Sequence, residues 1–283
     1  MLIDLHTHST TSDGTDSPTK VVDNAQRVGL GVIALTDHDT FDGLDEARAR
    51  GERLALRVLN GLEMSTTRLG HEVHVLGYGC RHDEPALQDE LTRLRQGRSG
   101  RIAAMCERLS AMGMLITEAE VLAQAAGAPS VGRPHVADVL VNKGYVVDRR
   151  QAFDQYLADD KPGFVPRYYT PLEAAIDLIQ GAGGAAVLAH AWGRGGREVL
   201  PVEVIEALVR DHGLDGIEVD HQDHDQTVRA TLGALADDLG LIKTGSSDYH
   251  GWGKTNFDLG CNTTAEDQLG RLLTVIGERG GHE

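Results

Sequence analysis

The sequence predicts an α/β protein organised around a parallel β-sheet. Seven short apolar runs rich in β-branched residues recur along the chain, and helix signals separate several of them. The length of 283 residues allows one large domain or a domain that carries an insertion. Strands that alternate with helices are typical of a parallel sheet, either open and doubly wound or closed into a barrel. The predicted strands are residues 2–5, 32–35, 58–59, 73–76, 185–188, 216–219 and 241–243.

Helix signals follow the first strand and several later ones. Ser17 followed by Pro18 is typical of an N-cap and the first helical position. Residues 170–173 (Thr-Pro-Leu-Glu) match a capping box with proline at its preferred place. Apolar spacing at 200–208 and 232–239 fits the buried faces of two further helices.

The long interval between the fourth and fifth predicted strands contains only helical patterns. Two apolar stripes have helical spacing, and residues 117–120 (Thr-Glu-Ala-Glu) predict another capping box. The stripes are Leu87, Leu91 and Leu94, followed by Ile102, Met105, Leu109 and Met112. We therefore expect a helical insertion at about 96–165, with 1–95 and 166–283 forming the catalytic domain.

The charge balance is strongly acidic. There are 27 lysines and arginines against 43 aspartates and glutamates, which gives a formal net charge of −16, and there are 13 histidines. A protein that grips long duplex nucleic acid or an anionic membrane normally presents a basic surface, so neither partner is expected. Carboxylates and neutral imidazoles are instead the donors that divalent metals take, although a soluble acidic surface is the simpler alternative.

Location and redox state follow from what the chain does not contain. No apolar run approaches the length of about 20 residues that spans a bilayer, and the N-terminus has no signal-peptide pattern. The three cysteines, Cys80, Cys106 and Cys261, form no CxxC motif. We expect them to be reduced and buried in a cytoplasmic protein.

Histidines and carboxylates recur at the ends of the predicted strands. His6 and His8 flank one residue of the first strand, so both imidazoles point to the same side. Any one histidine is equally consistent with a core or capped imidazole. The carboxyl ends of parallel strands, however, face one crevice where ligands and catalytic groups lie, and the joint pattern indicates a metal site. The later members of the pattern are Asp37-His38-Asp39, Glu63, His74, His190 and Asp248-Tyr249-His250.

Asp13 follows the first strand closely enough to reach the same crevice. The dipeptide Asp13-Gly14 is also a common turn, which is the alternative interpretation. Asp37 and Asp39 flank His38, and either is able to orient the imidazole without binding a metal itself.

Taken together, these motifs resemble the polymerase and histidinol phosphatase (PHP) family of metal-dependent phosphoesterases, within the amidohydrolase-like barrels. The resemblance extends from residue 4 to residue 250. It implies a distorted (β/α)7 TIM-like barrel with a helical insertion between strands 4 and 5. That arrangement is most similar to the stand-alone members that act on nucleotides, including those that hydrolyse 3′,5′-nucleoside bisphosphates and short 5′-phosphorylated RNA.

The resemblance also implies a set of metal ligands. His6, His8, Glu63 and Asp248 would hold one ion, and Glu63 would bridge to a second ion held by His74 and His190. Asp13, His38 and His250 would surround a third position, although some relatives have histidine where Asp13 stands. Two or three divalent ions are therefore expected. Manganese is favoured by the resemblance, while zinc and iron also suit imidazole and carboxylate ligands.

Candidate substrate contacts lie outside this set. Arg133 and His135 are expected on a loop over the site, where relatives use the matching residues on phosphate, and a guanidinium binds phosphate through two hydrogen bonds. Arg194 and Arg197 follow His190 in a glycine-rich segment, and His221 follows the sixth strand. The basic run of Arg93, Arg95, Arg98, Arg101 and Arg108 is typical of a solvated helix face, with guidance of a short nucleic-acid strand as the alternative.

The expected function is hydrolysis of a nucleotide phosphate ester by a metal-bound hydroxide. Glu63, His190, Asp248 and His250 are the expected catalytic residues, and a mononucleotide or short oligonucleotide is the expected substrate. Hydrolysis of histidinol phosphate is a rival that the long insertion disfavours. A non-catalytic metal-binding module is a second rival, which would predict missing ligands, whereas every expected position here holds a usable donor.

Overall fold

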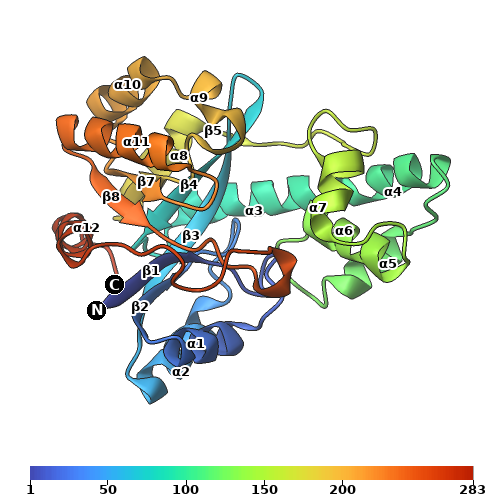
Figure 1. Cartoon of the computed structure of the whole chain (residues 1–283), viewed down its shortest axis with the longest axis horizontal. Helices are drawn as coiled ribbons and strands as arrows, with labels where there is room; N and C mark the ends of the chain where they lie inside the picture. The colour runs from blue at the N-terminus through green and yellow to red at the C-terminus, as the bar shows by residue number, and fades with distance from the viewer. Residues whose placement is uncertain (283) are drawn as a thin grey trace.

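The computed structural model describes residues 1–282, apart from the side chain of Arg194, and has a mixed α/β fold with one sheet of eight strands (Figure 1). The strand order is β1-β2-β3-β4-β6-β7-β8, and the short β5 pairs with β3. The strands are β1 (Leu2–Thr7), β2 (Leu30–Leu35), β3 (Arg57–Arg68), β4 (His71–Tyr78), β5 (Thr170–Pro171), β6 (Ala185–Leu188), β7 (Gly216–Asp220) and β8 (Ile242–Gly245). All seven predicted strands are present.

The prediction of an all-parallel sheet is wrong at β4. This strand runs antiparallel to β3 on one side and to β6 on the other, while β1, β2 and β3 are parallel, as are β6, β7 and β8. The cause is the connection between β3 and β4, which is only Leu69-Gly70 with φ of 53° and 81°. Two residues with positive φ form a hairpin turn, whereas a parallel crossover needs a dozen residues or more.

Helices cover the sheet and continue into a separate helical region. They are α1 (Pro18–Arg27), α2 (Leu44–Leu54), α3 (Pro85–Gly100), α4 (Ile102–Ala111), α5 (Glu118–Gln124), α6 (Arg133–Asn142), α7 (Arg149–Ala152), the π-helix η1 (Phe153–Leu157), α8 (Leu172–Gly181), the 3₁₀ turns η2 (Gly193–Gly195) and η3 (Gly251–Gly253), α9 (Gly196–Val199), α10 (Val202–His212), α11 (Gln226–Asp238) and α12 (Glu266–Glu278). No described helix is long and apolar enough to cross a membrane.

Two of the predicted helix starts are confirmed and one is wrong. Ser17 caps α1 by accepting from the backbone of Lys20, and Thr117 forms the expected capping box with Glu120. The capping box expected at 170–173 is absent, because Thr170 lies in β5 and its hydroxyl donates to Glu90 at 2.6 Å. Helix α8 therefore begins at Leu172 without a side-chain cap.

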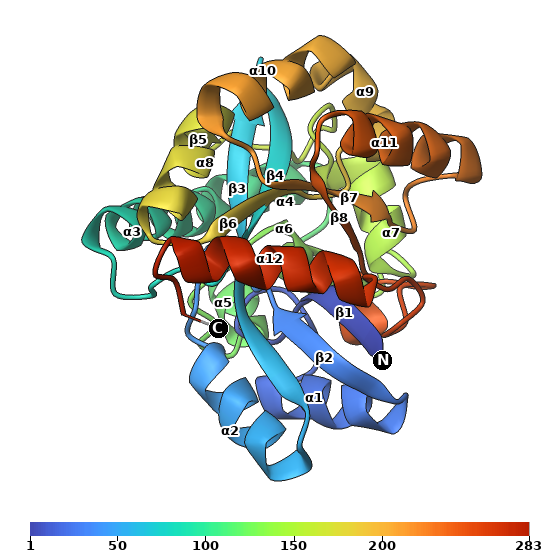
Figure 2. The same ribbon diagram turned by 90° about the vertical axis from the view of Figure 1, so that its left-hand side faces the viewer.

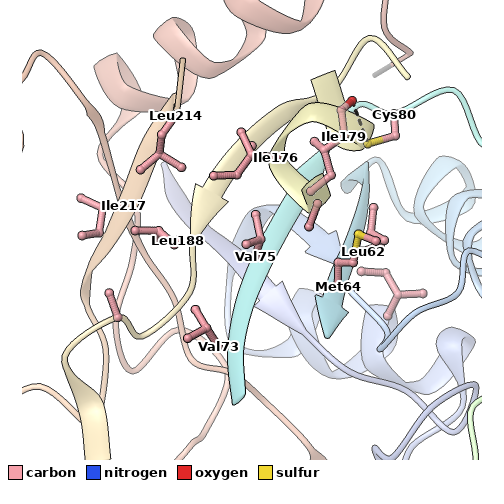
Figure 3. Packing of buried hydrophobic residues seen from close by; sticks show 14 of the residues in the cluster. Leu62, Met64, Val73, Val75, Cys80, Ile176, Ile179, Leu188, Leu214 and Ile217 are labelled. Carbon is pink, nitrogen blue, oxygen red and sulfur yellow. Dashed lines mark hydrogen bonds between the residues drawn. The ribbon is translucent and has the colours of Figure 1, made fainter. Parts of the chain in front are cut away.

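Both sides of the sheet are covered by buried apolar residues. Figure 3 shows one side, where Leu62, Val75 and Leu188 pack against Ile176 and Ile179 of α8. The other side is covered by α12, which lies across the strands in Figure 2. This packing fixes the strands, and the candidate site residues lie at or just beyond their ends, apart from Glu63 and His74, which lie within β3 and β4.

The helices between α4 and η1 have a hydrophobic cluster of their own, formed by residues between Ile102 and Leu157. Figure 1 shows this group beside the sheet, reached by the long helix α3. The stripe of Leu87, Leu91 and Leu94 is buried as predicted, but in the cluster of the sheet. The second stripe is confirmed except at Met112, which is 39% exposed, because α4 ends at Ala111. The cysteines are free, and Cys261 is exposed, which corrects the expectation that all three are buried.

The first strand and the segment after the last one lie side by side. The backbone N–H of His8 donates to the carbonyl of Tyr249 at 2.8 Å, and Thr7 and Tyr249 form a parallel bridge. The carboxyl ends of β1 and β8 are therefore adjacent, which brings the His6–His8 pair next to Asp248.

Candidate metal centre

One buried carboxylate, Glu63 of β3, is surrounded by imidazoles. Its Oε1 atom lies 2.8 Å from His74 Nδ1 and 3.1 Å from His190 Nε2. These two histidines come from β4 and from the end of β6. The side chain of Glu63 is 2% exposed, so the contacts are formed away from bulk water.

The other oxygen of Glu63 faces the first two strands. Oε2 lies 3.3 Å from His6 Nε2, 3.2 Å from His8 Nε2 and 3.1 Å from His38 Nδ1. The position of Glu63 in the middle of a long, buried strand therefore places one carboxylate between two groups of imidazoles.

Asp248 closes the same group from the segment after β8. Its Oδ1 atom is 3.5 Å from His6 Nε2, 3.4 Å from His8 Nε2 and 3.4 Å from His250 Nδ1. Its other oxygen contacts Lys254 Nζ and lies 3.3 Å from His221 Nε2. The two carboxylate oxygens therefore have separate partners, with Oδ1 directed at the candidate ligands.

Asp13 lies at the end of the cluster opposite His74. Its carboxylate is 3.2 Å from His250 Nε2 and 3.7 Å from both His38 Nε2 and His8 Nδ1. All nine residues expected to bind metal are thus brought together. Three overlapping groups have ligand atoms within 4.8 Å of one another: His8, Asp13, His38 and His250; His6, His8 and Asp248; and His38, Glu63 and His74.

The hydrogen bonds among these side chains are incomplete, and bound divalent cations would supply the missing partners. The Nε2 atoms of His6 and His8 lie 3.0 Å apart, a distance that two facing lone pairs tolerate only with a proton or a cation near them. Nδ1 of His8, of His38 and of His74 is buried and forms no hydrogen bond, although Glu63 lies 3.1 and 2.8 Å from the last two. Buried polar atoms are almost always partnered, so these nitrogens indicate ligands of an ion.

The pKa values of the carboxylates keep them ionised. Burial favours the neutral acids, but the surrounding imidazoles hold the pKa of Glu63 and of Asp13 well below the usual range. Lys254 and His6 do the same for the pKa of Asp248. The site therefore carries three negative charges that a cation would neutralise.

The imidazoles fall into two classes. Burial lowers the pKa of His38 to about 3 and that of His190 to about 4, and burial with Lys254 lowers that of His250 to about 4. These three are neutral, as metal ligands must be. For His8 and His74 burial is outweighed by neighbouring carboxylates, which raise the pKa to about 9, and the pKa of His6 is raised well above its usual value.

The backbone is strained at the same place. Asp39, His190 and Asp248 have φ of 56°, 31° and 53°, in the left-handed region that side chains other than glycine seldom adopt. Each is a candidate ligand or directly follows one. Such strain persists only where surrounding structure enforces it, and it gathers at functional sites.

Glu218 of β7 is a site residue that the sequence analysis missed. It is fully buried, lies 3.2 Å from His6 Nδ1, and accepts from the backbone N–H of His190 at 2.8 Å and from the hydroxyl of Ser246. A carboxylate on Nδ1 favours the tautomer in which Nε2 faces the ions. The available signal was an acidic residue in the middle of an apolar strand.

The aspartates that flank His38 hold its loop in place. Asp37 accepts from the hydroxyls of Ser9 and Ser12, both at 2.6 Å. Asp39 forms a buried ion pair with Arg98 Nε at 2.6 Å. The prediction that these residues support His38 is consistent with both contacts, since neither carboxylate belongs to a group of candidate ligands.

Buried arginines lie beside the centre and join it through Glu72. This carboxylate is 3.3 Å from His74 Nε2, 2.5 Å from Arg133 and 3.2 Å from Arg167. Arg101 and Arg98 are also buried, which contradicts the interpretation of a solvated face for these two residues, whereas Arg93 and Arg108 of the same run are exposed. The reason is that α3 ends against the site, so its last turn faces inward rather than toward solvent.

The buried guanidinium groups of Arg101 and Arg167 are incompletely paired with carboxylates and hydrogen-bond acceptors. Arg101 forms no ion pair with any described carboxylate, and Nε of both arginines is buried without a hydrogen-bond partner. Burial together with Arg133 lowers the pKa of Arg101 to about 10, and burial together with Arg98 lowers that of Arg167. We call Arg98, Arg101, Arg133 and Arg167 the arginine pocket, a name for these four side chains and not for a cavity.

The remaining expected contacts have mixed outcomes. Arg133 and His135 lie in the first turn of α6 and not on a loop, because Gly132 and Pro134 are suited to start a helix. His221 is buried against Asp248, which places it behind a candidate ligand. Arg197 is exposed and stacks on Trp192 at 4.7 Å. The side chain of Arg194 lies outside the described part of the chain.

Comparisons with known proteins agree with this geometry. A family model described as the PHP domain matches residues 4–125. A 3′,5′-nucleoside bisphosphate phosphatase from Chromobacterium violaceum is 38% identical, covering 91% of this chain and 90% of the relative. The 5′-3′ exoribonuclease Rnm from Escherichia coli is 34% identical, covering 88% and 85%.

Solved structures lead to the same family. A protein from Bifidobacterium adolescentis, described as a metal-dependent phosphoesterase, superposes with a TM-score of 0.92 at 35% identity and 96% coverage of both chains. An amidohydrolase from Chromobacterium violaceum, solved with sulfate and no metal, gives a TM-score of 0.85 at 35% identity, covering 99% of this chain and 97% of that one. With similarity over nearly its whole length, this chain belongs to the PHP domain family.

Proposed function

We propose that this chain is a metal-dependent phosphoesterase that hydrolyses nucleotides carrying two phosphate groups. The substrate is a 3′,5′-nucleoside bisphosphate or a short 5′-phosphorylated oligonucleotide. The observation that carries the proposal is the arginine pocket beside the metal centre. It supplies an excess of buried positive charge at a fixed place, linked to a candidate ligand through Glu72.

The metal ligands would be divided among the ions as their positions suggest. His6, His8 and Asp248 face one position, and Glu63 with His74 and His190 face a second. Asp13, His38 and His250 face a third. When bound, such ions supply a hydroxide nucleophile near neutral pH and neutralise the phosphoryl oxygens during in-line displacement. Manganese is our first choice, with zinc and iron as alternatives.

The protein side chains position the substrate. The arginine pocket would bind the phosphate that is not cleaved, because guanidinium groups bind phosphate in pairs of hydrogen bonds and their mutual repulsion is relieved by an anion. His135, whose pKa is lowered by burial, lies in the first turn of α6 beside Arg133 and would contact the phosphate as a neutral imidazole. A substrate with one phosphate would leave this pocket empty.

The names of the relatives support a nucleotide substrate. The two curated relatives described above act on a nucleoside bisphosphate and on RNA from its 5′ end. Both substrate classes place a 5′-phosphate one nucleoside away from the phosphate ester that is broken. In this chain, the 5′-phosphate would lie at the arginine pocket and the phosphate ester that is broken would lie at the metal centre.

Release of inorganic phosphate from 3′-phosphoadenosine 5′-phosphate is the direct test. Metal-stripped protein reloaded with Mn²⁺, Zn²⁺ or Mg²⁺ should turn over this substrate in a metal-dependent manner. Glu63→Ala and Asp248→Ala should abolish turnover, while Glu203→Ala in the first turn of α10 serves as a control. Intact turnover in both site variants would refute the site assignment.

A second comparison separates nucleotides from histidinol phosphate. Arg101→Met should raise KM for the bisphosphate and leave the kinetics with histidinol phosphate unchanged, since that substrate has one phosphate. Faster turnover of histidinol phosphate by the wild-type protein would favour the rival function.

We also propose the finer architecture expected for this family. The sheet would close into a distorted (β/α)7 barrel, which is supported by the bridge between Thr7 and Tyr249. Residues 1–95 and 166–283 would form the catalytic domain, and 96–165 would cap the site in the cytoplasmic enzyme. The separate cluster of α4 to η1 supports this division, although its first boundary falls within the last turns of α3.

A further inference from the structure

Trp252 is an exposed aromatic residue at the edge of the metal centre that the proposed function does not use. It lies in η3, two residues after the candidate ligand His250, and is 64% exposed. Large aromatic side chains usually bury most of their surface, so a tryptophan this exposed beside a site suggests a ligand contact.

The residue is held in place by atoms that belong to the site. Its backbone N–H donates to Thr15 Oγ1 at 3.0 Å, and the same hydroxyl donates to the carbonyl of His250 at 3.1 Å. The backbone of Trp252 is therefore held to the segment that carries His250.

Arg149 of α7 supports the ring and ties it to Asp13. Its guanidinium lies 5.4 Å from the ring centroid of Trp252 and donates to the carbonyl of Asp13 at 2.7 Å. Two further bonds to Asp138, of 2.6 and 2.7 Å, fix the guanidinium plane. A rigid aromatic surface supported by a cation loses little conformational entropy when a base stacks on it.

The arginine pocket and Trp252 contact the metal cluster through different residues. The pocket reaches the cluster through Glu72 and His74, while Trp252 reaches it through His250 and Asp13. The His74 ring contacts those of His38 and His190, and the His250 ring contacts that of His8. A chain whose 5′-phosphate fills the pocket and whose next phosphate lies at the metals would thus continue toward Trp252.

We propose that Trp252 stacks on the base of the nucleotide that follows the scissile phosphate. The inference rests on the proposed function and narrows it, since it makes a 5′-phosphorylated dinucleotide a better substrate than a nucleoside bisphosphate. Stacking depends on the face of the base, so purines are preferred to pyrimidines at this position without other sequence selection.

The test compares two substrates in the manganese-loaded enzyme. Trp252→Ala should lower kcat/KM for 5′-phosphorylated diadenosine monophosphate about 5- to 150-fold more than for 3′-phosphoadenosine 5′-phosphate, corresponding to about 1–3 kcal/mol of stacking. Trp252→Phe should recover most of the loss. Leu122→Ala on α5, which removes another exposed apolar side chain, should leave the ratio unchanged.

A binding measurement gives a readout independent of turnover. Tryptophan fluorescence of the wild-type protein should be quenched by a phosphorothioate analogue of the dinucleotide, and Trp252→Phe should lose that quenching. If the ratio of kcat/KM for the two substrates is the same in Trp252→Ala as in the wild-type protein, the inference about Trp252 is wrong, whatever the oligomeric state of the variant. The proposed function would be unaffected by that result. Wild-type protein that hydrolyses neither substrate would overturn the proposed function as well.

Discussion

Replacing Glu218 with glutamine tests how the protein prepares a metal ligand. The carboxylate lies 3.2 Å from His6 Nδ1 and accepts from the backbone of His190. Glutamine has nearly the same shape but offers one acceptor oxygen and an NH₂ group, so at least one of the donors that surround Glu218 would face another donor. The charge that stabilises His6 in its ligand tautomer would also be lost.

The size of the effect follows from the position of the residue. Carboxylates that orient metal-binding histidines typically contribute 10- to 100-fold to metal affinity, which is about 1.4–2.8 kcal/mol. Glu218 is fully buried, so water cannot replace the lost contact, and we expect a value in the upper half of this range. Because His6 faces both Glu63 and Asp248, turnover at limiting metal should fall in parallel.

The assay is competition between the metal-stripped protein and a chromophoric chelator for Mn²⁺ or Zn²⁺. Asp220→Asn is the matched control, since Asp220 ends the same strand and its side chain is 53% exposed. If Glu218→Gln binds metal within a factor of two of the wild-type protein, the assignment of Glu218 as a positioning residue is incorrect.

Three further outcomes are expected. The pKa of His8 and of His74 is raised to about 9, so both imidazoles are protonated near pH 7.5 in the metal-free protein. Metal binding should therefore release protons, and metal affinity should increase as pH rises toward 9. Calorimetry in buffers of different ionisation enthalpy should then give different observed enthalpies of metal binding. Arg98→Met should lower the free energy of unfolding in urea by about 3–5 kcal/mol, because it leaves Asp39 charged and buried. The double variant Arg98→Met with Asp39→Asn should recover part of that loss. A double variant no more stable than the single one would contradict this explanation. Thr117→Ala should cost about 1 kcal/mol through the lost cap of α5, with Thr231→Ala on the exposed surface of α11 as control.

Some features were accessible from the sequence because they depend on local patterns. The strand ends carry the candidate ligands as His-x-His, Asp-His-Asp and Ser-Asp-Tyr-His, and their convergence follows from the geometry of parallel strands. Buried stripes and caps such as that of Thr117 also depend only on nearby residues. The ligand cluster was therefore predictable before its distances were known.

Other features depend on contacts between distant segments and gave no comparable signal. The run of Arg98 and Arg101 has the appearance of a solvated helix face, and only the approach of α3 to Glu72 and Asp39 reverses that interpretation. The antiparallel direction of β4 follows from the short turn at Leu69-Gly70, but a glycine in a short loop does not by itself indicate a hairpin. Glu218 was overlooked because one acidic residue in a strand has many explanations.

The net charge of −16 and the arginine pocket together favour a small anionic substrate over a long one. Long nucleic acids bind through many phosphates spread over a basic surface, and an acidic protein repels them. Here the positive charge is concentrated in buried guanidinium groups next to a cluster whose three carboxylates would be neutralised by cations. Because the positive charge is confined to the guanidinium groups and the metal cluster, a nucleotide with two phosphates gains from both, whereas the distant phosphates of a long strand would gain nothing.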